Sequence, residues 1–127
     1  MPKPRLLLAD DDLDCAELLR SVLEDEFAVV GIVHDGPALV QAAARLRPDV
    51  VVTDVSMPGL DGVSAAAVIL RQQLAQRVLF ITADCSAELA ERCLTIGASG
   101  CVPKHRAGED LVDAIHSVLA TAVRAAR

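Results

Sequence analysis

Aromatic residues are almost absent from this chain, which has no tryptophan, no tyrosine and only two phenylalanines among its 127 residues. Its hydrophobic fraction nevertheless reaches 53%, so leucine, valine, isoleucine and alanine must build the core. A chain of this length can bury one core without help from disulfides or metals. We therefore expect a single globular domain over residues 1–127, with its core at about residues 5–122.

Runs of lysine or arginine are also missing, and the formal net charge is −6. Because nucleic-acid binding depends on a basic face, this chain is not expected to bind DNA by itself. The apolar run near the N-terminus is only the segment LLLA, which is too short for a signal peptide or a membrane span. We expect a cytoplasmic protein that makes no contact with a membrane.

Closely spaced cysteine pairs are missing as well. The four cysteines, Cys15, Cys85, Cys93 and Cys101, form no CxxC motif, so the ligand spacing of a structural zinc site is absent. Each cysteine lies within an apolar pattern. The sequence therefore predicts four buried, free thiols.

Short apolar runs alternate with longer segments of helical periodicity. Such strict alternation predicts an α/β fold, with a parallel sheet covered by helices on both faces. The apolar runs are unbroken, as expected for strands buried on both sides. The expected strands are 5–9, 28–33, 50–53, 78–82 and 100–102, and the expected helices are 13–24, 36–46, 63–74, 86–96 and 109–122.

Charged and polar residues stand where the expected strands end. Asp10 and Asp11 follow the first strand, Asp54 the third, Thr82 ends the fourth, and Lys104 follows the fifth. Ligands of open parallel sheets bind beyond the carboxyl ends of the strands, so we expect these side chains to meet.

Carboxylates that meet in this way repel one another. At a separation of about 5 Å, each like-charge pair costs about 3 kcal/mol at an effective dielectric constant of 20, and a cation must offset that cost. Mg²⁺ suits carboxylate oxygens, and three carboxylates would balance one Mg²⁺ and one ammonium. This arrangement suits phosphoryl transfer to an aspartate, which depends mainly on positioning and charge neutralisation.

Four motifs, each at a strand end, carry a family resemblance: LLLADDD, DVVVTDVSMPGLDG, LFITA and GASGCVPK. In this order they resemble the receiver domain of bacterial two-component response regulators, most closely the NarL/FixJ (LuxR-type) subgroup. The resemblance covers essentially the whole chain. It implies a doubly wound (βα)5 flavodoxin-like three-layer sandwich, with a five-stranded parallel sheet in the order 2-1-3-4-5.

The resemblance also implies a magnesium site. Asp54 would be the phosphoacceptor and a metal ligand, Asp11 a direct Mg²⁺ ligand, and Asp10 the acid that holds a metal-bound water. The backbone carbonyl of Ser56 would supply a further ligand.

The remaining site residues would bind the phosphoryl group and transmit its arrival. By resemblance, Thr82 and the Ala83 backbone amide would bind one phosphoryl oxygen and Lys104 another. The switch would involve Thr82 and position 101, which is usually aromatic in the family. Because this position is Cys101, a small side chain, we expect a weakened relay in which either Cys101 or a movement of the fourth helix fills the volume that Thr82 vacates.

The implied partners are a sensor histidine kinase and a second copy of the chain, which would bind through the fourth helix, fifth strand and fifth helix, or through the first and fifth helices. Transcription would be controlled through a DNA-binding domain outside these residues. A stand-alone response regulator acting by protein–protein interaction is the main alternative.

Three other readings are weaker. An aspartate-dependent phosphatase would use Asp10 and Asp12, but usually needs a longer chain. A flavin carrier would need a hydroxyl-rich loop where this chain has DDD. A degenerate receiver without phosphorylation disagrees with the complete set of acidic residues, threonine and lysine. We therefore expect a signalling domain rather than an enzyme.

Overall fold

Five parallel strands form one sheet in the order β2-β1-β3-β4-β5, and a helix follows each strand. The computed structural model describes residues 2–83 and 85–120. The elements are β1 (Arg5–Ala9), α1 (Leu13–Leu23), β2 (Ala28–Val33), α2 (Gly36–Leu46), β3 (Val50–Asp54), α3 (Gly62–Arg71), β4 (Arg77–Thr82), α4 (Ala87–Ile96), β5 (Gly100–Pro103), the short 3₁₀ helix η1 (Lys104–Arg106) and α5 (Ala107–Ala120). The predicted fold class and strand order are confirmed.

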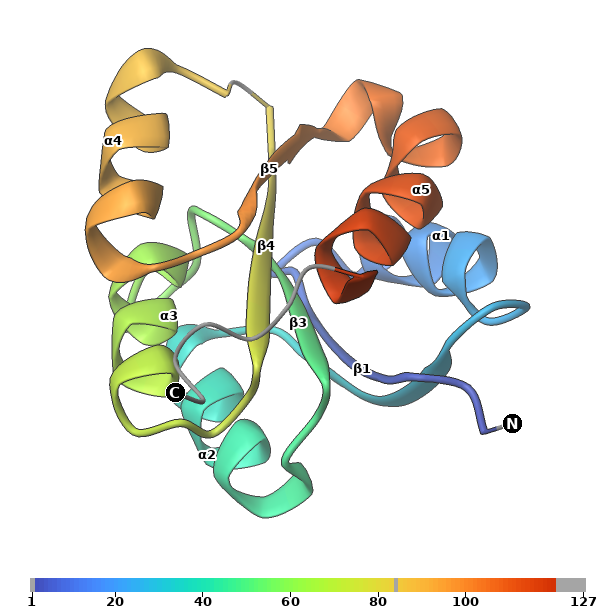
Figure 1. Cartoon of the computed structure of the whole chain (residues 1–127), viewed down its shortest axis with the longest axis horizontal. Helices are drawn as coiled ribbons and strands as arrows, with labels where there is room; N and C mark the ends of the chain where they lie inside the picture. Colours follow the sequence, from blue (N-terminus) through green and yellow to red (C-terminus); the bar gives the residue numbers. More distant parts are fainter. Residues whose placement is uncertain (1, 84, 121–127) are drawn as a thin grey trace.

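The sheet separates two hydrophobic cores. Helices α2, α3 and α4 cover one face of the sheet, and α1 and α5 cover the other (Figure 1). Alternate residues of β1 point to opposite faces, so Leu7 belongs to the first core and Leu6 and Leu8 to the second. All five residues of β3 are buried, which explains its continuous apolar sequence.

The third helix is shorter than its apolar pattern predicts. It ends at Arg71, because Gln73 adopts a left-handed backbone conformation with φ 57°. The Leu74 amide then donates to the Ile69 carbonyl at 2.9 Å, and Leu74 turns into the core. Leu74 therefore fits the apolar spacing of α3 although it lies beyond the end of that helix. The fifth helix starts two residues before its predicted start at residue 109, and its predicted end at residue 122 lies outside the described residues.

Side chains cap the helices that follow the acidic strand ends. The Asp12 carboxylate accepts the Cys15 amide at 3.1 Å and is the N-cap of α1, as its position next to an apolar helical pattern indicates. Asp61 caps α3 in the same way, by accepting the Ser64 amide at 2.8 Å. Asp54 therefore has no capping role, and its side chain is available for other contacts.

The prediction of four free, buried thiols holds in full only for Cys93, because Cys15 is free but only partly buried. Cys85 and Cys101 form a disulfide, whereas Cys15 and Cys93 are free. Cys85 follows β4 and is exposed, and Cys101 lies on the neighbouring strand β5. The pairing depends on how β4 and β5 lie in the sheet, which a separation of 16 residues does not reveal. The expected relay through Thr82 and Cys101 stays a prediction, and in the bonded state Cys101 is tied to Cys85.

Across residues 2–83 and 85–120, no helix is both long enough and apolar enough to cross a membrane.

Candidate functional site

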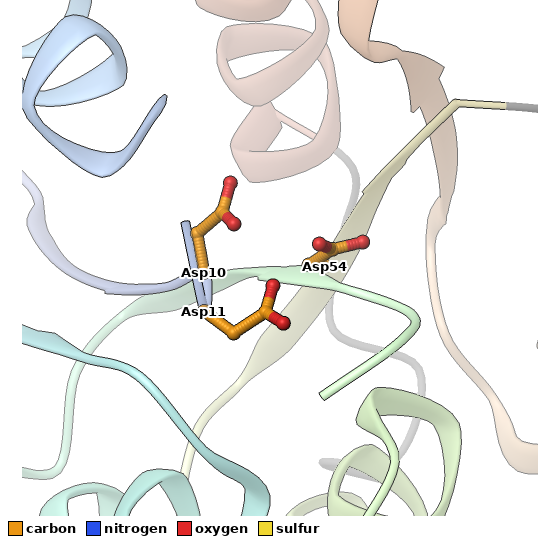
Figure 2. Close-up of side chains that lie close together, drawn as sticks. All are labelled: Asp10, Asp11 and Asp54. Carbon is orange, nitrogen blue, oxygen red and sulfur yellow. The ribbon is translucent and has the colours of Figure 1, made fainter. Parts of the chain in front are cut away.

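Three carboxylates gather at the carboxyl ends of β1 and β3 (Figure 2). One oxygen each from Asp10, Asp11 and Asp54 lies within 4.8 Å of the others. The two strands are neighbours in the sheet, with Ala9 opposite Thr53, so the residues that follow them share one edge. Asp10 is fully buried and Asp54 is 8% exposed, whereas Asp11 is open to solvent. The cluster is therefore buried on one side and accessible on the other.

Lys104 joins two of these carboxylates. Its Nζ lies 3.0 Å from Asp54 Oδ2 and 3.1 Å from Asp10 Oδ2. Burial of the ammonium lowers the pKa of Lys104, but its hydrogen bond to Asp54 and the negative charges of Asp10 and Asp54 outweigh this effect and raise the pKa above its usual value. The side chain is thus a fixed positive charge at neutral pH.

The acidic cluster keeps unmet acceptor capacity beside this lysine. Asp10 Oδ1 accepts the Asp12 amide at 3.0 Å, and Asp54 Oδ1 accepts the Val55 amide at 2.7 Å. Asp10 Oδ2 is buried and makes an ion pair with Lys104, but this contact lacks the geometry of a good hydrogen bond. Because three carboxylates face one ammonium, the cluster retains an excess of negative charge. Hard oxygen donors with such an excess fit a divalent cation like Mg²⁺.

The other predicted site residues border the cluster. Thr82 ends β4 and lies opposite Pro103, the residue before Lys104. Ala83 follows in an exposed bend. Ser56 is exposed in the loop two residues after Asp54. The structure thus brings Asp10, Asp11, Asp54 and Lys104 into one cluster, with Thr82, Ala83 and Ser56 on the adjoining strand end and loops.

A glycine allows the chain to turn back beside Asp54. The Gly62 amide donates to the Val55 carbonyl at 2.7 Å. A Cβ at position 62 would lie 1.9 Å from the Asp54 carbonyl oxygen, a distance that no side chain tolerates. The start of α3 is therefore packed against the backbone of Asp54 itself.

Sequence reasoning missed two neighbours of Asp10. Burial and the neighbouring Asp10 carboxylate raise the pKa of the Cys15 thiol to about 11. His34 Nδ1 lies 2.9 Å from the Asp10 carbonyl oxygen. The place of His34 at the end of β2, next to β1, was the available signal. Cys15 gave none, because its position fits an ordinary apolar helix face.

Comparison with known proteins gives the same result as the motifs. Residues 6–116 match the response regulator receiver domain family. The chain is 36% identical over 115 residues to the transcriptional regulatory protein PdtaR of Mycobacterium tuberculosis, covering 87% of this chain and 54% of PdtaR. It is 32% identical over 117 residues to the transcription regulator BvgA of Bordetella pertussis, covering 91% of this chain and 56% of BvgA.

Two solved structures show the same fold. The signal receiver domain of the response regulator NarL from M. tuberculosis superposes with a TM-score of 0.87 at 29% identity, covering 94% of this chain and 98% of that one. A LuxR-family two-component response regulator from Aurantimonas gives 0.86 at 31% identity, covering 93% and 86% of the two chains. The chain spans about half the length of the curated relatives it matches. By its motifs, its fold and its match over residues 6–116, the chain belongs to the response regulator receiver domain family.

Proposed function

We propose that Asp54 of this domain accepts a phosphoryl group from a sensor histidine kinase or a small phosphodonor, and that Mg²⁺ is required. The contact between Asp54 and Lys104, 3.0 Å long, carries the proposal. It places a fixed ammonium at the carboxylate that ends a fully buried strand. Asp54 also retains exposed surface through which a donor could reach it.

In this reaction a carboxylate oxygen of Asp54 forms a bond to phosphorus while the bond from phosphorus to the donor nitrogen or oxygen breaks. Lys104 stays charged and pairs with a phosphoryl oxygen, and Thr82 and the Ala83 amide donate hydrogen bonds to another. Asp11, Asp54 and the Ser56 carbonyl would bind Mg²⁺ directly, and Asp10 would hold its water. The cation would neutralise the negative charge that accumulates on the carboxylates and the phosphoryl oxygens.

The geometry argues against the phosphatase alternative. That reading makes Asp10 the nucleophile, yet Asp10 has no exposed surface, and one of its oxygens accepts the Asp12 amide. Asp12 caps α1 and is committed to that contact. Both carboxylates pair with Lys104, but Asp54 is the better nucleophile because it alone of the two keeps exposed surface.

The test is incubation with acetyl phosphate and Mg²⁺, followed by intact-protein mass spectrometry and peptide mapping. We expect the mass to rise by one phosphoryl group, and Asp54→Asn to abolish the gain. Asp61→Asn is the matched control, because Asp61 is a helix cap outside the acidic cluster. Label on Asp10, or label that survives Asp54→Asn unchanged, contradicts the assignment.

We further propose that residues 1–127 form one receiver domain of a cytoplasmic signalling protein that is not an enzyme acting on other substrates. Phosphorylation would shift a two-state equilibrium and change a partner or dimer surface. That surface would lie on α4, β5 and α5, or on α1 and α5. Leu94 on α4 is 80% exposed and Leu18 on α1 is 70% exposed, so both surfaces offer an apolar contact.

Control of transcription is the proposed output, through a DNA-binding domain outside this chain. The support is that PdtaR and BvgA are regulators of transcription about twice as long as the matched region. The alternative is a stand-alone regulator that acts by protein–protein contact. Measuring the mass of the natural polypeptide in its source cells separates the two, because only the first requires a longer chain.

A further inference from the structure

The Cys85–Cys101 disulfide closes a ring that contains the whole of α4. Cys85 immediately precedes Ser86, the N-cap of α4, and Cys101 lies in β5, opposite Phe80 of β4. The two Cα atoms are 6.3 Å apart, within the range that a disulfide spans. The bond therefore fixes the entrance of α4 to the edge strand of the sheet.

Helix α4 has the fewest buried residues of the five helices, counted over the residues that the structure describes. Among the described residues of the five helices, α4 has only two buried residues, Leu89 and Cys93, whereas α3 has five. Leu94 is 80% exposed on the same helix. Elements with few buried contacts open most readily. A covalent bond at the start of α4 would therefore change its mobility more than that of any better-packed helix.

The two cysteine residues also differ in exposure to solvent. Cys85 is exposed, and Cys101 is partly buried. A small disulfide in solution can react with an exposed thiol to form a mixed disulfide. A partly buried cysteine beside it can then attack this mixed disulfide and displace the small thiol. In a reducing compartment, disulfides are usually transient or regulatory rather than permanent.

We propose that Cys85 and Cys101 are a reversible thiol–disulfide site whose oxidation restrains α4. A small-molecule disulfide such as oxidised glutathione is the oxidant. The Cys85 thiolate attacks one of its sulfurs and releases one glutathione thiolate. The Cys101 thiol then loses its proton and attacks the Cys85 sulfur, which releases the second. The two cysteines lose two electrons and two protons in total, and one oxidised glutathione becomes two reduced glutathiones.

The disulfide lies close in the sequence to two residues of the candidate site. Thr82 is three residues before Cys85, and Lys104 is three residues after Cys101. The redox site thus gives the domain a second input beside Asp54. Its formation and its effect on α4 do not depend on phosphorylation of Asp54, so they stand or fall independently of the proposed function.

The first test counts thiols in the whole chain after equilibration with different ratios of reduced to oxidised glutathione. The protein is then denatured in N-ethylmaleimide, which alkylates every free thiol. The intact mass gives the number of N-ethylmaleimide adducts per chain. We expect four adducts in the reduced protein, which has four cysteines, and two in the oxidised protein, from Cys15 and Cys93. The change should be reversible. Cys85→Ser and Cys101→Ser should each abolish it, whereas Cys93→Ala should keep it.

Two outcomes of this count overturn the proposal. Four adducts under the most oxidising ratio show that no bond forms. Two adducts under the most reducing ratio show a permanent structural bridge rather than a reversible site.

The second test is amide hydrogen exchange of wild-type protein in its oxidised and reduced states, which needs no substitution. We expect exchange of the α4 amides to slow by about tenfold on oxidation, with α2 amides unchanged as the internal control. Cys85→Ser should give the reduced pattern under both conditions. Equal α4 exchange in the two wild-type states refutes the restraint, whatever Asp54 does with a phosphodonor.

Discussion

Lys104 Nζ contacts Asp54 Oδ2 at 3.0 Å and Asp10 Oδ2 at 3.1 Å, so one ammonium from the end of β5 bridges carboxylates from β3 and β1. The bridge spans the central part of the sheet, since β4 lies between β3 and β5. Lys104 therefore supplies part of the positive charge that neutralises these carboxylates, and we assign the remaining part to Mg²⁺. The stability of the domain should then depend on both cations together.

Lys104→Met should destabilise the domain in the absence of divalent cations. The substitution leaves the Asp10 and Asp54 carboxylates facing each other without their counter-charge, and we expect a loss of about 2 kcal/mol in the free energy of unfolding. Mg²⁺ should restore more stability to the variant than to wild type, because it supplies the missing charge. Urea denaturation with and without Mg²⁺ measures both effects.

Lys3→Met is the control for the lysine substitution, because Lys3 makes only an exposed contact with the Glu24 carbonyl. It should change stability little and without dependence on Mg²⁺. If the loss at Lys104→Met is the same at every Mg²⁺ concentration, the lysine and the metal do not share one charge site.

Asp11→Ala should weaken Mg²⁺ binding more than Asp10→Ala does. Asp11 is exposed and free to bind a cation directly, whereas Asp10 is fully buried and already accepts the Asp12 amide. We expect a loss of about tenfold to a hundredfold in affinity for Asp11→Ala, and a smaller loss for Asp10→Ala. Isothermal titration with MgCl₂ measures this. Negligible losses for both variants would place the metal elsewhere.

The sheet and its helices were predictable because each element carries its own local signal. The burial of β3 on both faces appears directly as VVV, and Gly97 ends α4 in a left-handed conformation with φ 84°. The clustering of Asp10, Asp54 and Lys104 was also foreseeable, because parallel strands bring their carboxyl ends to one edge.

The missed features depend on contacts that no local pattern encodes. The Cys85–Cys101 bond depends on β4 and β5 being neighbours in the sheet. Likewise, the left-handed turn at Gln73 ends α3 although Leu74 still fits the helical apolar period. In both cases the apolar pattern indicated that a residue packs against the core, but it gave neither the disulfide partner nor the backbone conformation.

Gly62→Ala should disrupt the loop that follows Asp54. The added Cβ would lie 1.9 Å from the Asp54 carbonyl oxygen, so the backbone of α3 or of Asp54 must move. We expect a loss of about 3 kcal/mol in unfolding free energy, together with loss of acetyl phosphate labelling. Thermal and urea denaturation give the stability, and intact mass gives the labelling.

Gly108→Ala is the matched substitution, since a Cβ at this position in α5 meets no atom within 4 Å. It should stabilise the protein by about 0.5–1 kcal/mol, because alanine is the better helix former. Unchanged stability and labelling in Gly62→Ala would show that the loop adapts without cost.

The buried thiol of Cys93 should make stability depend on alkaline pH. Desolvation raises the pKa of Cys93 above its usual value of 9.0 in the folded protein, and the charge of Arg92 opposes this only partly. The unfolded chain then loses the thiol proton at a lower pH than the folded chain. As the pH rises above about 9, the unfolded state binds fewer protons than the folded state, so the unfolding free energy must fall. The contribution is complete below pH 9 and is lost as the pH rises toward the folded pKa.

Cys93→Ala isolates this effect, because alanine cannot titrate while every other group remains. At pH 7 the variant should be less stable than wild type by about 1 kcal/mol, since it loses a buried sulfur on α4. That difference should shrink between pH 9 and pH 10, as ionisation stabilises the unfolded wild-type chain alone. Urea denaturation in the presence of a reductant measures both proteins across this range. A difference that stays constant or grows with pH would show that the Cys93 thiol ionises equally well in the folded and unfolded protein.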